Sequence, residues 1–462
     1  MKRRNTIGIL IPAATALCTM LALAIPGFCE EAVLPAAQKS AMPPSIEPPP
    51  ARFSLDADRI QPGEKLTLNR GIMIALRKNP YIVAASGGVN VIESRVGEAR
   101  ASYYPQLSAQ GGYSRTTPIT GTAAATAGQH TDLYNNSITL SQNLIDFGKA
   151  SSQVDIQKFN LEASRSDFNV ATDRIIFNVK QAYYNVLQSG RSRDVSTDIV
   201  KQFQQHLDQA KGFYEVGTKA RIDVIRAEVD LSNAKLNLIK AENAFRISRV
   251  VLNNAMGVPE APEYAVEDDL AVHKFEIAYD EALKRAYDNR PDLKSLRAKR
   301  EAAQESIGLA RTGYYPVLNG SAGYTWSGQD FPLDKSWSAG VSLTIPLFSG
   351  FLTTHQVAEA KAALAVLKAN EEALRQQVLL DIQQSFLNLQ QAEDSIGTAE
   401  LAVKQAQENL ALANGRYTAG VGSPIEVTDA FAAYTNAQAN YTSALYGYKI
   451  AQASIEQAMG AR

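Results

Sequence analysis

A stripe of apolar residues with helical spacing is the longest regular pattern along the chain. Its members recur every three or four residues, close to the heptad of a coiled coil, at Ile382, Phe386, Leu389, Ala392, Ile396, Ala399, Val403, Ala406, Leu410 and Ala413. The surrounding run 350–413 contains no proline, and as one helix it would extend about 95 Å at 1.5 Å per residue. The run 147–211 is nearly as long. Such helices exceed any globular core, so they predict a rod-like assembly, whereas an ordinary soluble bundle would need shorter helices.

Two segments in the C-terminal half alternate between apolar and polar residues, as strands do. Trp337, Ala339, Val341, Leu343, Ile345 and Leu347 alternate with hydroxyl side chains and glycine, and Leu318, Gly320, Ala322, Tyr324 and Trp326 do the same. Strands of about ten residues span a bilayer when they are tilted. The N-terminal counterpart is less regular, since Gln142 occupies a position where an apolar residue is expected. The alternative is a half-buried sheet of a soluble protein.

The number of strands bears on how a membrane could be spanned. Two hairpins supply only four strands, and an open sheet leaves edge groups without hydrogen-bond partners in hydrocarbon. Several chains must therefore pool their strands if these cross a membrane. Two chains reach eight strands and three reach twelve.

Two pairs of similar segments indicate that the chain is a duplication. ARASYYPQLSAQGGYS at 99–114 and ARTGYYPVLNGSAGYT at 310–325 share eight of sixteen residues at an offset of 211. GFYEVGTKARIDVIRA at 212–227 and GRYTAGVGSPIEVTDA at 415–430 share six residues at an offset of 203. The eight-residue difference predicts a longer loop in the first half, within the Thr/Ala/Gly-rich stretch 116–136.

Composition and charge exclude several classes of protein. A hydrophobic content of 45% and a mean hydropathy of -0.18 exclude a transporter built of membrane-spanning helices. The net charge of -1 gives no indication that a polyanion such as nucleic acid is a partner. The four histidines are scattered without ligand spacing, and no nucleophile elbow, phosphate loop or paired-cysteine site is present in 30–462. The sequence therefore predicts no catalytic residue, no cofactor and no metal site.

The N-terminus has the build of a secretory signal, predicted over residues 1–29. Lys2, Arg3 and Arg4 precede an apolar stretch, and cleavage near Cys29 would remove both cysteines and leave a net charge near -4. Lipidation at Cys29 and a single anchoring helix are the alternatives. Bulky Phe28 disfavours the first, and Pro12 and Pro26, which bracket too short an apolar run, disfavour the second.

The remaining chain divides at changes of composition. Residues 30–63 form a proline-rich tail that should be extended and poorly packed. Residues 64–257 form the first repeat with a β-hairpin at 103–146, 258–275 a linker, and 276–460 the second repeat with a β-hairpin at 314–348. Each repeat is predicted as helix, two strands, long helix, tight turn and helix.

The order of these motifs resembles the TolC family of outer-membrane efflux ducts. The resemblance lies in the duplicated order, in Tyr103-Tyr104-Pro105 and Tyr314-Tyr315-Pro316, in the strand exits LIDFG and LFSGF, and in the paired segments 212–227 and 415–430. It implies a mainly α homotrimer with a small transmembrane β part. Its twelve-stranded barrel in outer-membrane lipid would continue into a twelve-helix coiled-coil tunnel across the periplasm.

The same resemblance assigns roles at the helical tips. It places acids of a periplasmic gate at Asp223, Glu426 and Asp429, with Lys219 and Arg226 as possible counter-charges. Threefold symmetry would stack the acids into rings of like charge at a constriction. Alternatively, Glu426 and Asp429 are first-turn acids stabilised by a helix N-terminus, at about 0.3–1 kcal/mol each. Some family members carry a basic residue at the position of Gly422, where it helps to hold the gate closed. This chain has glycine there, so that contact is not expected.

The tip turns are the expected contacts with a partner. They comprise Val216, Gly217 and Thr218 in the first repeat and Ala419, Gly420 and Val421 in the second. The resemblance implies that a periplasmic adaptor (membrane fusion) protein docks there, together with an inner-membrane pump of RND or ABC type. The glycines are equally typical of C-terminal helix stops. The predicted function is a passive outer-membrane exit duct for tripartite efflux or type I secretion; the alternative is a wholly periplasmic coiled-coil adaptor or scaffold.

Overall fold

Each half of the chain folds into the same series of helices and strands. In the computed structural model, which describes residues 60–116, 130–268 and 274–461, the first half contains α2 (Leu68–Lys78), α3 (Pro80–Arg100), β2 (Gln106–Thr116), β3 (Thr131–Ile145), α4 (Lys149–Glu215) and α5 (Arg221–Met256). The second half contains α6 (Tyr279–Asn289), α7 (Pro291–Arg311), β5 (Val317–Gly328), β6 (Asp334–Thr344), α8 (Leu352–Thr418) and α9 (Pro424–Ala458). Short 3-10 turns, Ala101–Tyr103 and Thr312–Tyr314, connect the helices to the strands. The duplicated unit is confirmed.

The change of offset falls at the predicted place. α3 begins at residue 80 and α7 at residue 291, which is the offset of 211. α4 begins at residue 149 and α8 at residue 352, which is the offset of 203. β2 ends at Thr116 and β3 begins at Thr131, whereas β5 ends at Gly328 and β6 begins at Asp334, so the first connection is the longer one. The predicted signal 1–29 and the tail up to residue 59 lie outside the described residues.

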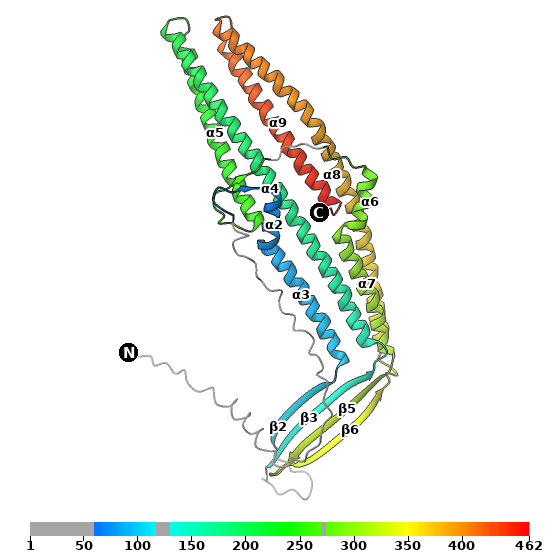
Figure 1. Ribbon diagram of the computed structural model, residues 1–462. Coiled ribbons are helices and arrows are strands. Elements are labelled where there is room, and N and C mark those ends of the chain that lie inside the picture. The colour runs from blue at the N-terminus through cyan, green and yellow to red at the C-terminus, as the bar shows by residue number, and fades with distance from the viewer. Residues whose placement is uncertain (1–59, 117–129, 269–273, 462) are drawn as a thin grey trace, which may run out of the picture. The chain divides into compact units, whose positions relative to one another are not determined.

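Two long antiparallel helical pairs, α4 with α5 and α8 with α9, dominate the described unit (Figure 1). The predicted stripe is confirmed, since Ile382, Leu389, Leu410 and Ala413 are buried. One core joins α2, α4 and α5 around Leu66, Ile74, Val179, Leu252 and Met256. Its counterpart joins α6, α7, α8 and α9 around Ala282, Leu293, Val378, Ile382 and Ile455.

Two glycines allow the C-terminal ends of α5 and α9 to pack closely against the short helices. Gly257 and Gly460 follow these helices at φ values of 73° and 67°, a conformation that favours glycine. A Cβ at Gly257 would lie 2.7 Å from Cα of Asn79, and a Cβ at Gly460 would lie 3.0 Å from Cα of Arg290. Each helix therefore ends directly against the junction between two short helices of its own repeat.

The four long strands form one antiparallel sheet in the order β2-β3-β5-β6. The strands join α3, α4, α7 and α8 at one end, and the turns α4–α5 and α8–α9 lie at the opposite end of the long helices (Figure 1). The apolar face of the sheet is uncovered by other described residues, and Trp337 on it is 78% exposed. β2 and β6 are edge strands with no further partner in the described chain.

A β-bulge explains the irregular pattern of the first hairpin. The pairing of β3 with β5 shifts by one residue between Asn143 and Ile145. The shift brings Leu144 against Gly320, where a Cβ would lie 3.3 Å from the leucine. The Gln142 side-chain amide instead donates to the backbone oxygen of Tyr103 at 3.3 Å. The extra residue thus supplies the apolar side chain that the alternation lacked.

A short parallel pair, β1 (Lys65–Leu66) with β4 (Ala265–Val266), was not predicted. The hydroxyl of Tyr183 on α4 donates to the backbone oxygens of Leu66 and Glu267, at 3.1 and 2.6 Å, and ties both segments to the long helix. Within the described residues, no helix has the length and apolar character needed to cross a membrane.

Candidate functional site at the helical tips

Both tip turns are closed by the same helix-ending geometry. Gly217 and Gly420 adopt φ values of 74° and 79° and follow the C-cap residues of α4 and α8, Val216 and Ala419. The N–H of Thr218 donates to the oxygen of Phe213, and the N–H of Val421 donates to the oxygen of Arg416. These are Schellman motifs, so the glycines do act as helix stops. The neighbouring Val216 and Val421 are 71% and 70% exposed, which leaves an apolar side chain at each tip.

The three predicted gate acids lie just past these turns, on α5 and α9. Asp223 is in the first turn of α5, whose N-cap residue Ala220 makes no side-chain cap. Glu426 is in the first turn of α9, which is capped by the Ser423 hydroxyl accepting from the N–H of Ile425 at 3.2 Å. Asp429 lies beyond the first turn. Stabilisation by the helix N-terminus therefore applies to Glu426 and Asp223 but does not account for Asp429.

One of the predicted gate acids, Glu426, has a cationic partner that is not among the predicted counter-charges. Nε of Arg416 lies 3.2 Å from Oε2 of Glu426 and joins the end of α8 to the start of α9. Among the described residues, neither Lys219 nor Arg226 forms an ion pair with Asp223. Lys219 instead places its Nζ 5.1 Å from the ring centre of Tyr417, in a cation–π contact with the other hairpin.

Gly422 occupies a place where a side chain does not fit. It is buried, and a Cβ there would lie 2.7 Å from N of Tyr417 and 2.9 Å from the carbonyl carbon of Arg416. The turn backbone closes directly onto the end of α8. A basic residue at this position would require the turn to shift, which gives a steric reason for the glycine.

Tyr417 is the centre of the packing between the two hairpins. It is fully buried, and its ring lies 5.1 Å from His206 and 5.8 Å from Phe213, both on α4. Phe203 and Phe431 lie 4.7 Å apart and extend the same contact. This cluster joins α4 with α8 and α9 close to the turns.

Two hydrogen bonds complete the contact between the hairpins. Gln209 on α4 donates to the hydroxyl of Thr418 at 3.0 Å, and Thr428 on α9 donates to the carboxylate of Asp230 on α5 at 2.9 Å. Opening of the tip by separation of the hairpins would have to break both bonds.

Sequence reasoning missed Tyr417 although the repeat contained a signal. Tyr417 and Tyr214 are identical positions of the two matched segments, yet Tyr214 is 46% exposed. The Tyr417 hydroxyl is buried without a hydrogen-bond partner among the described residues. Burial raises the pKa of Tyr417, and the Asp223 carboxylate adds to this shift. Only the fold distinguishes the buried copy from the exposed one.

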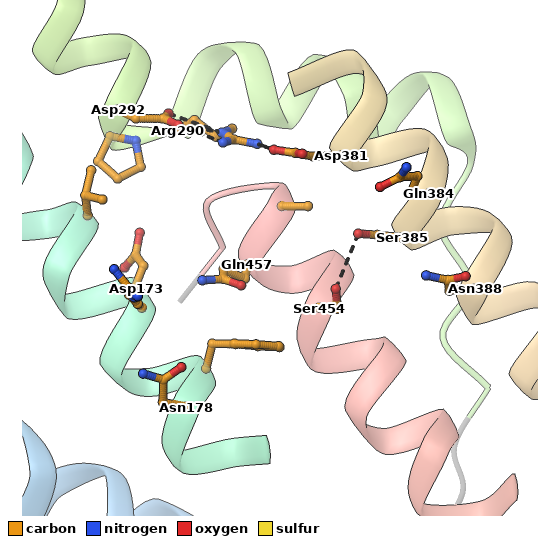
Figure 2. Close-up of a pocket in the computed structure, with 15 residues that line it drawn as sticks. Asp173, Asn178, Arg290, Asp292, Asp381, Gln384, Ser385, Asn388, Ser454 and Gln457 are labelled. Carbon is orange, nitrogen blue, oxygen red and sulfur yellow. Dashed lines mark hydrogen bonds and ion pairs between the residues drawn. The ribbon is translucent and has the colours of Figure 1, made fainter. Parts of the chain in front are cut away.

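A second polar region lies between α4, α7, α8 and α9, away from the tips (Figure 2). This cleft of about 530 Å³ contains Arg290, which bridges Asp292 at 2.7 Å and Asp381 at 2.8 Å. Ser385 and Ser454 face each other across it at 3.4 Å. The Arg290–Asp381 pair joins the α6–α7 junction to α8, and the serine pair joins α8 to α9. In the part of the chain that is described, no three His, Cys, Asp or Glu side chains are placed to hold a metal ion.

Comparison with known proteins gives a consistent result. The model of the family described as "Outer membrane efflux protein" matches residues 72–258 and 282–461. The outer membrane protein TolC of Vibrio cholerae is 23% identical over 401 residues, covering 84% of this chain and 89% of the relative. TolC of Escherichia coli is 24% identical and covers 83% and 80% of the two chains. The crystal structure of the Campylobacter jejuni CmeC outer membrane channel superposes with a TM-score of 0.75 at 19% identity, covering 85% of each chain.

Proposed function

Because the chain belongs to the outer membrane efflux protein family, it is an outer-membrane exit duct for efflux or secretion, and we propose that its helical tips form the gate of that duct. Proteins of this family are trimeric channels that work with adaptor and pump partners. The alternative of a periplasmic adaptor is not favoured, because both the relatives and the structural neighbours are outer-membrane channels.

The open sheet supports assembly into a trimer. Among the described residues, its edges β2 and β6 have no neighbouring strand on their outer sides, and nothing covers its apolar face. Closure into a barrel pairs both edge strands. A sheet within lipid needs this closure, because its backbone groups find no other hydrogen-bond partners there. Three copies of the four-stranded sheet would supply twelve strands.

The observation that carries the gate proposal is the position of the acids relative to the turns. Asp223 and Glu426 lie in the first turns of α5 and α9, and Asp429 follows on the same helix at a spacing of three residues. In a trimer each acid would be repeated three times around the axis. Rings of like charge at a constriction attract cations and resist closer approach of the helices.

Block by multivalent cations in planar-bilayer recordings tests this gate. We expect that E426A/D429A raises the concentration of a trivalent cation needed for half-maximal block by about tenfold, since each trimer loses six carboxylates. The matched control is E400A, which removes an exposed acid of α8 far from the turn. Equal block of the natural protein, E426A/D429A and E400A would contradict the gate. Glu426 would then only stabilise the N-terminus of α9, and Asp429 would have no assigned role.

The exposed tip valines support the proposed partner contact. Val216 and Val421 beside the glycine turns are exposed apolar side chains, and Ile222 and Ile425 in the first turns of α5 and α9 are exposed as well. We propose that an adaptor protein docks on these turns and that a pump of RND or ABC type supplies the energy. Crosslinking before co-purification identifies the partner, and V216D/V421D is expected to lose it while the conservative V216L/V421L retains it.

A further inference from the structure

A buried histidine lies inside the contact that must separate when the tips open. His206 on α4 is 5% exposed, and its ring lies 5.1 Å from that of Tyr417 on α8. Its Nδ1 is buried without a hydrogen-bond partner among the described residues. Protonation would place an N–H donor at both ring nitrogens, and Nδ1 has no acceptor to receive that bond.

The surroundings of His206 are polar, but among the described residues no acceptor forms a hydrogen bond with its Nδ1. A cavity of about 370 Å³ adjoins it, formed by α4, α8 and α9 and lined by Gln202, Gln205, Gln209, Gln407, Asn414 and Tyr434. The Oε1 atom of Gln202 is also buried without a partner. Gln205 and Gln407 on its rim are exposed, whereas His206 is buried, so separation of the hairpins would expose the His206 ring itself to water, which could solvate an imidazolium.

The charges that face His206 come from the neighbouring elements. α5 contributes the carboxylates of Asp223 and Asp230, which favour the imidazolium, but burial has the larger effect and the pKa of His206 is lowered from its ordinary 6.5. α8 contributes Tyr417, whose ring already lies 5.1 Å from the Lys219 ammonium. α9 contributes the neutral Tyr434, and the lining residues of α4 are neutral amides. A second cation beside Tyr417 would therefore be unfavourable in the packed state.

We propose that His206 is a positioning residue that couples opening of the tips to acidification: the neutral imidazole packs the two hairpins together, and its protonation favours their separation. The inference rests on the proposed function, because it assumes that the hairpin contact closes the duct. It adds a regulating stimulus, the proton concentration at the tips.

The direction of the effect follows from proton linkage. A histidine whose pKa is lowered in the packed state binds protons mainly after the hairpins separate. Packing is therefore fully stabilised above pH 6.5, the ordinary histidine pKa, and weakens as the pH falls below it. If separation restores the ordinary pKa, a change from pH 7.5 to 5.5 favours the open state by up to about tenfold per protomer.

Planar-bilayer recording of the full-length trimer tests the proposal. The buffer on the tip side is changed from pH 7.5 to 5.5 while the other side stays at 7.5. The open fraction of the natural protein should rise several-fold, and that of H206Q, which cannot be protonated, should change less than about twofold. H355Q is the matched control, because His355 is exposed at the start of α8 and should leave the response intact. An equal rise in H206Q, or no rise in the natural protein, would overturn the inference.

A crosslink keeps the test decisive if H206Q does not assemble. Q209C/T418C replaces two residues whose side chains are hydrogen-bonded across the hairpins, while His206 is retained. A short thiol crosslinker should abolish the response to acid, and a reducible linker should restore it on cleavage. A response that persists in the crosslinked trimer contradicts the proposal. If no variant conducts at either pH, the result contradicts the duct itself. If the channels conduct but H206Q responds to acid as the natural protein does, the result contradicts only proton sensing by His206.

Discussion

Arg416 reduces the negative charge that each protomer contributes to the tips. Its guanidinium lies 3.2 Å from Glu426, and both side chains remain about half exposed, so the pair is accessible to solvent and ions. Within the described part of the chain, Glu426 is thus paired and Asp429 forms no ion pair, and the proposed acid ring combines these two carboxylates of each α9 with Asp223 on α5. The local charge depends on a residue that precedes the turn rather than on the nominated Lys219 or Arg226.

Removing Arg416 should strengthen block by cations. We expect R416Q to lower the half-blocking concentration of a trivalent cation roughly two- to fivefold, in keeping with the modest strength of exposed ion pairs. The double variant R416Q/E426Q removes both charges and should return the value close to that of the natural protein. If R416Q were blocked no more readily than the natural protein, Arg416 would have no influence on the ions at the proposed gate.

Tyr417 should act through its ring rather than its hydroxyl. The hydroxyl has no partner among the described residues, so Y417F loses no hydrogen bond and should keep the resting conductance of the natural protein. Y417A removes the ring that contacts His206, Phe213 and Lys219, and it should destabilise the tip by about 3–5 kcal/mol and raise the resting conductance. A leaky Y417F would point to a hydrogen bond that the closed tip depends on.

The positions of the acids were readable from the sequence, but their neighbours were not. The matched segments place Asp223 and Glu426 at equivalent positions after a turn. The contacts of Arg416 with Glu426 and of His206 with Tyr417 depend on which face of a helix meets another hairpin. Because the two copies share a tyrosine but bury only one, repetition alone could not reveal the contact.

Among the structural elements, the second tip turn depends on the absence of a side chain at Gly422. We expect G422A to destabilise the trimer by about 1–3 kcal/mol, because the new methyl group would meet the backbone of residues 416 and 417. G415A is the matched control, since a Cβ at this helical position meets nothing within 4 Å and should stabilise α8 by about 0.5–1 kcal/mol. Thermal unfolding followed by circular dichroism should give a lower Tm for G422A only.

Helices and offsets were predictable because they depend on local periodicity and on repetition. α4 and α8 occupy the long runs that lack proline, and the change of offset lies in the predicted loop. The bulge at Asn143 could not be predicted, because it is defined by pairing with β5, a strand far away in the sequence. The two-residue strands β1 and β4 are too short to produce a pattern.

At the scale of the whole molecule, the duplication predicts how one chain meets the next. β3 and β5 belong to different repeats and pair with Ile138 opposite Tyr324. The equivalent residues of the free edges are Val341 on β6 and Tyr113 on β2, at the same offsets of 203 and 211. If the contact between chains repeats the contact between repeats, Val341 of one copy lies opposite Tyr113 of the next.

Cysteine crosslinking tests this register and the trimer together. Y113C/V341C should give a ladder ending at the mass of three chains when membranes are treated with a short thiol crosslinker. A109C/V341C shifts one partner by four residues along the edge and should crosslink far less. Equal products from both pairs would contradict the register, and monomers alone, in a protein recovered from the soluble periplasm, would contradict the channel.

The matched lengths of the helices determine what a partner meets at the end of the tunnel. α4 and α8 each have 67 residues, so the two turns of one chain end about equally far from the sheet. Three chains would present six tips of two kinds in alternation, one with Lys219 and the other with Gly422 at equivalent positions. A threefold assembly thus ends in a nearly sixfold rim, and a partner that repeats six times around it would face two alternating surfaces.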